Sequence, residues 1–331
     1  MREASQPIGV IGAGSVGTIL AAHFEAAGRR TVVVECGSRY DQVKTDDLRI
    51  TGALRMSAKP WRVARTLEEL SDTDRVAPWL WCVCTKTWSV PSLLPSLRRW
   101  LPPSARVLSV QNGMGAEDML AGTLGPHRVA CAAINFAGGI ADDGFSVRLS
   151  WFNPPNYVGV CSGEDRTAEE AATLLTEAGL PTEAVSSDQI RQRLFYKTVL
   201  NVGLNALCAV TGITMGEAMG MAHTRALAQT LVEEALEVGR ALGHDFGPDA
   251  IGQAMRYLDR GGDHKPSMAV DLERKAPTEI DFINGKIVAL AKTHPELCVR
   301  ANRFLASLVV TREVRNGTRS TEDIPPYLRG P

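Results

Sequence analysis

The sequence predicts two domains, an α/β domain over residues 1–186 followed by an all-α domain over residues 187–331. A glycine-rich turn stands between an apolar strand and a helix close to the N-terminus. Short β-branched strands then alternate with amphipathic helices as far as Val185. From Ser187 onward, apolar residues recur at three- and four-residue steps, which is the period of a helix. A length of 331 residues is sufficient for two separate cores.

The composition is that of a globular protein, with 44% apolar and 22% charged residues. The net charge is −1 without a long basic run, so we expect neither a nucleic-acid nor an anionic-membrane partner. No signal segment precedes the first strand, and the apolar run 77–84 is too short to span a bilayer. We therefore expect a cytoplasmic protein. Its seven cysteines and six histidines lack metal-ligand spacing, so we expect reduced thiols and no metal site.

The first predicted strand, Ile8–Ile11, is followed by Gly12, Ala13, Gly14, Ser15, Val16 and Gly17. A helix over 18–27 and a strand over 31–35 come next. In such a unit, Gly12 permits the tight turn, Gly14 lets a pyrophosphate approach the backbone, and Gly17 lets the helix pack closely on the strand. The helix N-terminus contributes free N–H groups and the positive end of its dipole. The sequence therefore predicts a dinucleotide-binding site.

Glu35 lies 18 residues after Gly17, at the end of the second predicted strand. A carboxylate there accepts hydrogen bonds from the adenosine ribose hydroxyls and repels a 2′-phosphate. Glu35 therefore favours NAD as the cofactor, with NADP as the alternative. Arg39 is the nearby residue that would reverse this preference, and a plain solvent-facing charge is the alternative interpretation of Glu35.

The α/β alternation continues to the predicted boundary near residue 186. We expect strands at 49–55 and 59–63 (as a hairpin), 79–84, 106–110 and 182–185, and helices at 66–70, 90–100 and 168–178. Two prolines are expected to interrupt the helix 90–100. Residues 129–160 look like an antiparallel or mixed extension of the sheet, with turns at 138–139, 142–144 and 154–155.

Lys86 and Asn112 each follow a predicted buried strand. Ligands of open parallel sheets bind beyond the carboxyl ends of the strands, so both residues are expected at the cofactor edge. A solvated loop charge is the alternative for Lys86, and an Asn-Gly turn former is the alternative for Asn112.

Helices are expected in the second domain at 189–210, 225–241, 248–258, 278–292 and 299–315. The first of these carries Lys197, Asn201 and Asn205 at positions i, i+4 and i+8, which stacks them on one face. A polar stripe on an apolar helix is costly to bury unless it lines a wet cleft or binds a polar molecule. We interpret the stripe as a reaction site. The alternative is a lysine that reaches solvent along its methylenes and asparagines that cap neighbouring loops.

Two further segments stand out in the second domain. Residues 265–268 form a proline-stiffened turn that contains Ser267. Thr278 and Asp281 resemble a capping box, which would place Glu279 in a first helical turn, where the dipole favours an ionised carboxylate. Such a carboxylate is a natural partner for a lysine, although first-turn acids often serve only the helix start.

These motifs together resemble the ketopantoate reductase (2-dehydropantoate 2-reductase) family. The resemblance extends over the whole chain and includes the glycine-rich turn, Thr85-Lys86, residues 111–115, the Lys-Asn-Asn stripe, residues 266–268 and residues 278–285. It implies an N-terminal α/β Rossmann domain, an all-α C-terminal domain and a cleft between them. It also implies NAD(P)H-dependent reduction of a 2-keto acid to a 2-hydroxy acid.

The resemblance also implies a role for each matching residue. Lys197 matches the general acid, and Glu279 matches a glutamate that interacts with the lysine or the substrate. The remaining matches are Asn201 and Asn205 for substrate oxygens, Ser267 for the carboxylate, and Asn112 and Lys86 near the nicotinamide and substrate.

Two departures from the family pattern bear on specificity. The family usually prefers NADPH and has an arginine just after the second strand, where this chain has Cys36 preceded by Glu35. Met215 and His264 stand roughly where some ketopantoate reductases have asparagines. The substrate is therefore ketopantoate or a related 2-keto acid. The alternatives are an imine, as in opine dehydrogenases, or a dinucleotide-binding sensor without turnover. A homodimer is the default assembly.

Overall fold

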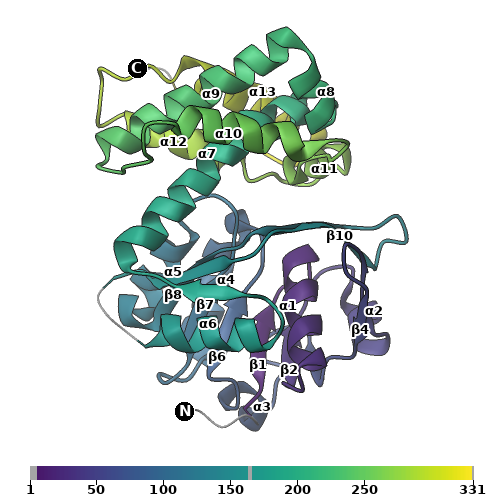
Figure 1. The fold of residues 1–331 in the computed structure, drawn as a ribbon. Coiled ribbons are helices and arrows are strands. Elements are labelled where there is room, and N and C mark those ends of the chain that lie inside the picture. Colours follow the sequence, from purple (N-terminus) through teal and green to yellow (C-terminus); the bar gives the residue numbers. More distant parts are fainter. Residues whose placement is uncertain (1–5, 163–165, 330–331) are drawn as a thin grey trace. The chain divides into compact units, whose positions relative to one another are not determined.

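The computed structural model describes residues 6–162 and 166–329. They form two compact units, and Figure 1 labels many of their helices and strands. The first unit contains the chain up to residue 111 together with residues 115–191, and the second contains residues 112–114 and those from 192 onward. The chain passes from one unit to the other within helix α7 (Ser187–Thr211).

An eight-stranded sheet forms the centre of the first unit. Its strand order is β12-β11-β8-β7-β6-β1-β2-β5, parallel throughout except between β8 and β11. The strands are β1 (Ile8–Ile11), β2 (Thr31–Val34), β5 (Arg62–Ala64), β6 (Leu80–Val83), β7 (Arg106–Ser109), β8 (Val129–Ala133), β11 (Asn156–Val160) and β12 (Thr182–Ala184). The central strands β1, β2 and β6 are buried at every residue, as their unbroken apolar runs predict.

A second sheet of four strands lies in the same unit, in the order β4-β3-β10-β9. Its strands are β3 (Leu48–Gly52), β4 (Met56–Ala58), β9 (Phe136–Ile140) and β10 (Val147–Phe152). Helix α1 (Ser15–Ala26) contacts strands of both sheets. Because it is covered from two sides, residues 17–24 are all buried, and the helix that follows the glycine-rich turn is held firmly in place.

Several expected elements of this unit differ in the structure. The hairpin exists, but its second strand is β4, and the predicted strand 59–63 instead leads into β5 of the main sheet. The predicted helix 66–70 is a turn, while α2 (Tyr40–Thr45) and α3 (Asp72–Val76) form unpredicted helices. Ser71 accepts a hydrogen bond from the Asp74 N–H at 3.1 Å and so caps α3, which begins at Asp72, beyond the end of the predicted helix.

The extension 129–160 also differs in detail, because its strands divide between the two sheets. The predicted turn at 138–139 is wrong, since both glycines lie within β9 and pair with β10. A Cβ atom on Gly138 would lie 3.0 Å from the Arg148 carbonyl oxygen, so this glycine serves close strand packing rather than a turn.

Three longer helices complete the first unit: α4 (Val90–Trp100), α5 (Ala116–Leu124) and α6 (Thr167–Glu177). The prolines do not interrupt α4. Pro91 stands in the first turn, where no intrahelical N–H bond is required, and Pro95 is accommodated inside the helix.

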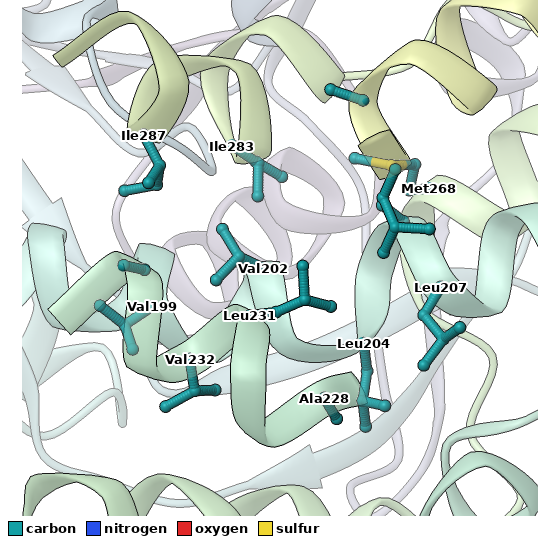
Figure 2. Close-up of a cluster of buried hydrophobic side chains, with 14 of the residues drawn as sticks. Val199, Val202, Leu204, Leu207, Ala228, Leu231, Val232, Met268, Ile283 and Ile287 are labelled. Carbon is teal, nitrogen blue, oxygen red and sulfur yellow. The ribbon is translucent and has the colours of Figure 1, made fainter. Parts of the chain in front are cut away.

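The second unit is helical, as predicted. Besides most of α7 it contains α8 (Met215–Gly220), α9 (Ala222–Ala241), α10 (Ala250–Leu258), α11 (Ser267–Glu273), α12 (Asn284–Ala291) and α13 (Arg300–Asn316). Figure 2 shows its core, where Val199 and Val202 of α7 lie with Leu231 of α9, Ile283 and Ile287. The helices α8 and α11 were not expected, and the helix predicted from 278 begins as α12 only at Asn284.

Among the described residues, α7 is the one helix long and apolar enough to cross a membrane by length and composition. Of its most apolar window, 61% is buried inside the structure, which is the pattern of a core helix. The buried side chains of α7 in Figure 2 belong to that core.

Candidate active site

The glycine-rich turn has the geometry that its three glycines predict. Gly12 has a φ of +92°, and a Cβ atom there would lie 3.0 Å from Thr85 Cγ2. A Cβ atom on Gly17 would lie 1.9 Å from the Gly12 carbonyl oxygen, whereas one on Gly14 would meet no described atom within 4 Å. The helix α1 starts directly after Gly14. An open approach to a helix N-terminus fits the pyrophosphate of a dinucleotide.

The Glu35 carboxylate lies against this turn. It accepts hydrogen bonds from the Ala13 N–H at 2.7 Å and from the Gly37 N–H at 2.6 Å. The acid at the end of β2 is therefore fixed by backbone groups on both of its oxygens. It remains partly exposed, as a group that binds a ligand must be.

Arg39 is directed toward the protein. Its guanidinium donates to the carbonyl oxygens of Ala13 and Phe145 and to Thr18 Oγ1, and it lies 5.4 Å from the centre of the Phe145 ring. Burial lowers the pKa of Arg39, and the charge of Glu35 partly offsets that effect. Arg39 thus ties the glycine-rich turn to the second sheet.

Lys86 follows β6 beside the same turn. Its carbonyl oxygen accepts hydrogen bonds from the Ser89 N–H at 3.0 Å and from Ser89 Oγ at 2.7 Å, which fixes the backbone after the strand. The neighbouring Thr85 packs against Gly12, and its Oγ1 is buried without a hydrogen-bond partner among the described residues.

The polar stripe of the second unit lies on an accessible side of α7. Lys197, Asn201 and Asn205 are each partly exposed, while Val199 and Val202 between them are buried. The Asn201 Nδ2 atom is buried and has no hydrogen-bond partner within the described part of the chain. An amide donor left in this state is available to a polar ligand.

The pKa of Lys197 is lowered to about 8. Burial of the ammonium group is the main cause, and the charge of Glu279 acts in the opposite direction. Glu279 is 4% exposed. The structure thus brings a lysine of altered acidity together with a buried glutamate in one unit.

The predicted capping box around Glu279 is wrong. Glu279 precedes a single 3₁₀ turn, η4 (Ile280–Phe282), and not the first turn of an α-helix. Thr278 Oγ1 accepts from the Ile280 N–H at 3.3 Å. Asp281 does not cap, because its carboxylate accepts hydrogen bonds from Tyr327 and Arg319.

Asn112 belongs to the second unit, because the two residues that follow it, Gly113 and Met114, contact Phe282 of that unit. The Met114 N–H donates to the Phe282 carbonyl oxygen at 3.0 Å. Gly113 has a φ of +79°, and a Cβ atom on it would lie 2.4 Å from the same oxygen. The segment after Asn112 therefore packs on Phe282 of η4, three residues after Glu279. A simple Asn-Gly turn would not need this contact.

The remaining predicted residues of the second unit lie around α8 and α11. Ser267 is the first residue of α11 and is exposed, so the expected turn at 265–268 is in part a helix start. The Met215 N–H donates to the His264 carbonyl oxygen at 3.0 Å, so these two departures from the family pattern are neighbours. Burial lowers the pKa of His264.

The predicted site residues therefore fall into two groups. The first unit holds the glycine-rich turn, Glu35 and Lys86; the second holds Asn112, Lys197, Asn201, Asn205, Ser267 and Glu279. No sequence pattern marked Glu313, Arg319 or Tyr327, which contact the segment around Glu279. Their partner Asp281 has a sequence signal, but that signal predicts a helix cap and not a contact with Arg319 and Tyr327.

Comparison with known proteins assigns the chain to a family. Residues 8–153 match the family model described as Ketopantoate reductase PanE/ApbA, and residues 189–313 match the model of its C-terminal part. The chain is 30% identical over 310 residues to a 2-dehydropantoate 2-reductase of Mesorhizobium japonicum, covering 86% of this chain and 91% of the relative. The corresponding protein of Archaeoglobus fulgidus is 28% identical over 313 residues, covering 94% and 99%.

Solved structures show the same fold. A PanE/ApbA family ketopantoate reductase from Ralstonia eutropha matches with a TM-score of 0.82 at 26% identity, covering 94% of this chain and 99% of that one. A D-mandelate dehydrogenase solved with NADH and anilino(oxo)acetate matches with a TM-score of 0.82 at 23% identity, with the same coverage.

The fold and site define an oxidoreductase that acts on a keto group and uses a cofactor of the NAD(P)H type. The chain belongs to the ketopantoate reductase family. The predicted fold class, a Rossmann-like α/β unit followed by a helical unit, is confirmed.

Proposed function

We propose that this protein reduces a 2-keto acid to the 2-hydroxy acid, with NADH as the hydride donor and Lys197 as the general acid. The observation that carries the proposal is the Lys197 ammonium with a pKa of about 8 near the buried Glu279. An acid whose pKa lies close to neutral pH can both hold and release its proton during turnover.

The bound dinucleotide supplies the hydride for the carbonyl carbon. The turn Gly12–Gly17 holds its pyrophosphate and Glu35 its ribose hydroxyls, with Lys86 at the strand ends beside the turn. As negative charge develops on the carbonyl oxygen, Lys197 Nζ gives its proton to that oxygen.

Other residues of the second unit orient the substrate. Asn201 offers the unpartnered Nδ2 donor to a substrate oxygen, and Asn205 extends the same stripe one turn further. Ser267 at the exposed start of α11 is assigned to the carboxylate, and Asn112, which precedes the Gly113-Met114 segment packed on η4, is assigned to the nicotinamide side. Glu279 keeps Lys197 protonated, because its charge raises the pKa of that lysine.

The preference for NADH over NADPH depends on two neighbouring side chains. Glu35 has both carboxylate oxygens at the edge of the turn, where a 2′-phosphate would meet a like charge. Arg39 directs its guanidinium to Ala13, Thr18 and Phe145, which opposes its use as a phosphate ligand. NADPH is the alternative cofactor.

The substrate is ketopantoate or a related 2-keto acid. Met215 and His264 are adjacent, and a change at both positions favours a pocket different from that of ketopantoate reductases with asparagines there. The D-mandelate dehydrogenase of similar fold carries anilino(oxo)acetate, so aromatic 2-keto acids are the second candidate class. An imine substrate and a sensor without turnover are the remaining alternatives.

The test follows absorbance of NADH and NADPH at 340 nm with ketopantoate, aliphatic and aromatic 2-keto acids, each with and without an amine. We expect NADH oxidation with at least one 2-keto acid and no need for the amine. Oxidation that requires the amine would identify an imine reductase instead. Cofactor binding without oxidation on any member of the panel would support the sensor.

We also propose a cytoplasmic homodimer. A dimeric ketopantoate reductase from Staphylococcus aureus has a similar fold, with a TM-score of 0.72 at 18% identity. Homodimers are the commonest assembly of soluble enzymes. Light scattering after size exclusion should give twice the chain mass of 35.7 kDa. A mass of one chain would contradict the dimer.

A further inference from the structure

Glu279 stands in a segment with little regular structure of its own. It precedes the three-residue turn η4, and Ile283 then separates η4 from α12 with a φ of −114° and a ψ of −99°. A single 3₁₀ turn is a weak support, because its hydrogen bonds have poor geometry. Other parts of the unit must therefore hold this glutamate in place.

We propose that Glu313, Arg319 and Tyr327, here called the C-terminal clamp, act as positioning residues that hold Glu279 in its place toward Lys197. The inference rests on the proposed role of Lys197 as the general acid. It gives a role to three residues within the last 19 positions of the chain, where no local sequence motif marks them.

The clamp holds the residue before Glu279. The Thr278 N–H donates to Glu313 Oε1 at 2.7 Å, and the Glu313 side chain is 1% exposed. The second oxygen of the same carboxylate accepts from Arg319 Nε at 2.6 Å. A buried carboxylate with both oxygens engaged fixes the backbone at Thr278 to helix α13.

The clamp also holds the segment two residues after Glu279. Asp281 Oδ1 accepts from the Tyr327 hydroxyl at 2.7 Å, and Asp281 Oδ2 accepts from Arg319 at 2.9 Å. Arg319, whose side chain is 14% exposed, binds both the Glu313 carboxylate, which holds the residue before Glu279, and the Asp281 carboxylate, two residues after Glu279. Linked charged hydrogen bonds in a partly buried place reinforce one another.

The protonation states suit this arrangement. Burial opposes the charge of Arg319, but Asp281 and Glu313 raise its pKa overall, so the guanidinium stays charged. Burial and the charge of Asp281 raise the pKa of Tyr327, so its hydroxyl remains a donor. Both donors of the clamp, the Arg319 guanidinium and the Tyr327 hydroxyl, therefore keep their protons.

Gly285 gives independent support. A Cβ atom on Gly285 would lie 2.4 Å from both Cζ and Oη of Tyr327. Any larger residue would displace the ring whose hydroxyl reaches Asp281. Two residues of the segment 278–285 that have no part in proton transfer, Asp281 and Gly285, are thereby both explained by contact with Tyr327.

The consequence for Lys197 has a definite sign. Burial lowers the pKa of Lys197 to about 8, and the charge of Glu279 opposes that shift. If Glu279 moves away, the pKa of Lys197 falls further. The protonated lysine is the competent acid, so the fall in kcat/KM at high pH would begin at a lower pH.

The experiment measures kcat/KM for the 2-keto acid against pH, with saturating NADH, in the full-length protein and its Tyr327→Phe variant. Tyr327→Phe removes one hydroxyl and keeps the ring beside Gly285. We expect the high-pH limb to move down by about 0.5 pH unit, which is less than the shift expected on removal of the Glu279 charge, because Glu279 is displaced but keeps its charge. The KM for NADH should stay unchanged.

A matched variant separates positioning from stability. Tyr257→Phe removes the hydroxyl of a second tyrosine of the same unit, on α10, which is partly buried whereas Tyr327 is buried. We expect it to leave the pH profile unchanged, whatever its melting temperature. If Tyr327→Phe lowers only the melting temperature and its pH profile coincides with that of Tyr257→Phe, the clamp is merely structural and the proposal is overturned.

Two further variants distinguish failure of the clamp from failure of the proposed function. If Lys197→Met keeps full turnover, the proposed function fails and the clamp proposal fails with it. If Lys197→Met is inactive and Glu279→Gln moves the high-pH limb while Tyr327→Phe does not, only the clamp is refuted.

Discussion

The two units each present one carboxylate to the proposed chemistry, and the two are held in different ways. Glu35 is partly exposed and accepts hydrogen bonds from the backbone N–H groups of Ala13 and Gly37. Ala13 lies in the turn between β1 and α1, and Gly37 follows β2. Glu279 is buried, and its charge raises the pKa of Lys197. The residues on either side of it, Thr278 and Asp281, are held by side chains from positions far along the chain.

This difference follows from what each carboxylate is proposed to do. A group that accepts hydrogen bonds from ribose hydroxyls works in contact with water, and backbone amides suffice to orient it. A group that sets the acidity of a lysine works through its charge, which acts most strongly where water is excluded. Burial in turn requires a position fixed by a network, because a loosely held buried charge is costly.

Among the tests of this contrast between the two carboxylates, the largest expected effect concerns the local support of Glu35. Gly17→Ala would place a Cβ atom 1.9 Å from the Gly12 carbonyl oxygen. We expect overpacking to lower the melting temperature by roughly 4–10 °C. The affinity for NADH, measured by calorimetry, should fall by roughly 10- to 100-fold because the displaced turn no longer presents its N–H groups.

Gly14→Ala is the matched control, since a Cβ atom there meets no described atom within 4 Å. We expect its melting temperature without cofactor to equal that of the wild type while NADH binding weakens. Equal melting temperatures for both variants would show that Gly17 is not the close-packing glycine.

The next effect tests the buried carboxylate. Glu279→Gln removes the charge that raises the pKa of Lys197, so that pKa should fall below its value of about 8. The high-pH limb of kcat/KM should then move down by about 1 pH unit, and kcat/KM at a pH about one unit above the wild-type pKa of Lys197 should fall by roughly 10-fold. A limb that moves upward or stays in place would refute the electrostatic pairing.

The smallest effect tests the exposed carboxylate. Glu35→Gln keeps most hydrogen bonds to the ribose but removes the repulsion of a 2′-phosphate. We expect the ratio of kcat/KM for NADH over NADPH to fall by roughly 3- to 10-fold, with kcat for NADH nearly unchanged. Cys36→Ser is the neighbouring control. An unchanged ratio would mean that Glu35 does not discriminate between the cofactors.

The same contrast explains how far the sequence could predict the molecule. Gly12, Gly14 and Gly17 act on neighbours within one βαβ unit, and the Lys-Asn-Asn stripe follows from the helical period alone. Such features depend on residues a few positions apart or on fixed motif spacing.

The predictions that were wrong concern residues whose structure is determined by partners far away in the sequence. Asp281 was predicted to cap a helix, but Tyr327, 46 positions later, takes its carboxylate. Gly138 and Gly139 signal a turn, but β10 pairs with them and makes them part of a strand. A strand partner or buried tyrosine from elsewhere in the chain leaves no local pattern, so tertiary contacts override the local preference.

The central claim is that Lys197 gives the proton in the reduction of a 2-keto acid. The most direct measurement is kcat for NADH-dependent reduction by Lys197→Met, beside Lys44→Met, which changes an exposed lysine of α2. We predict that kcat of Lys197→Met falls by about 10²–10⁴-fold while NADH still binds, and that Lys44→Met resembles the wild type. Full turnover by Lys197→Met would contradict the claim.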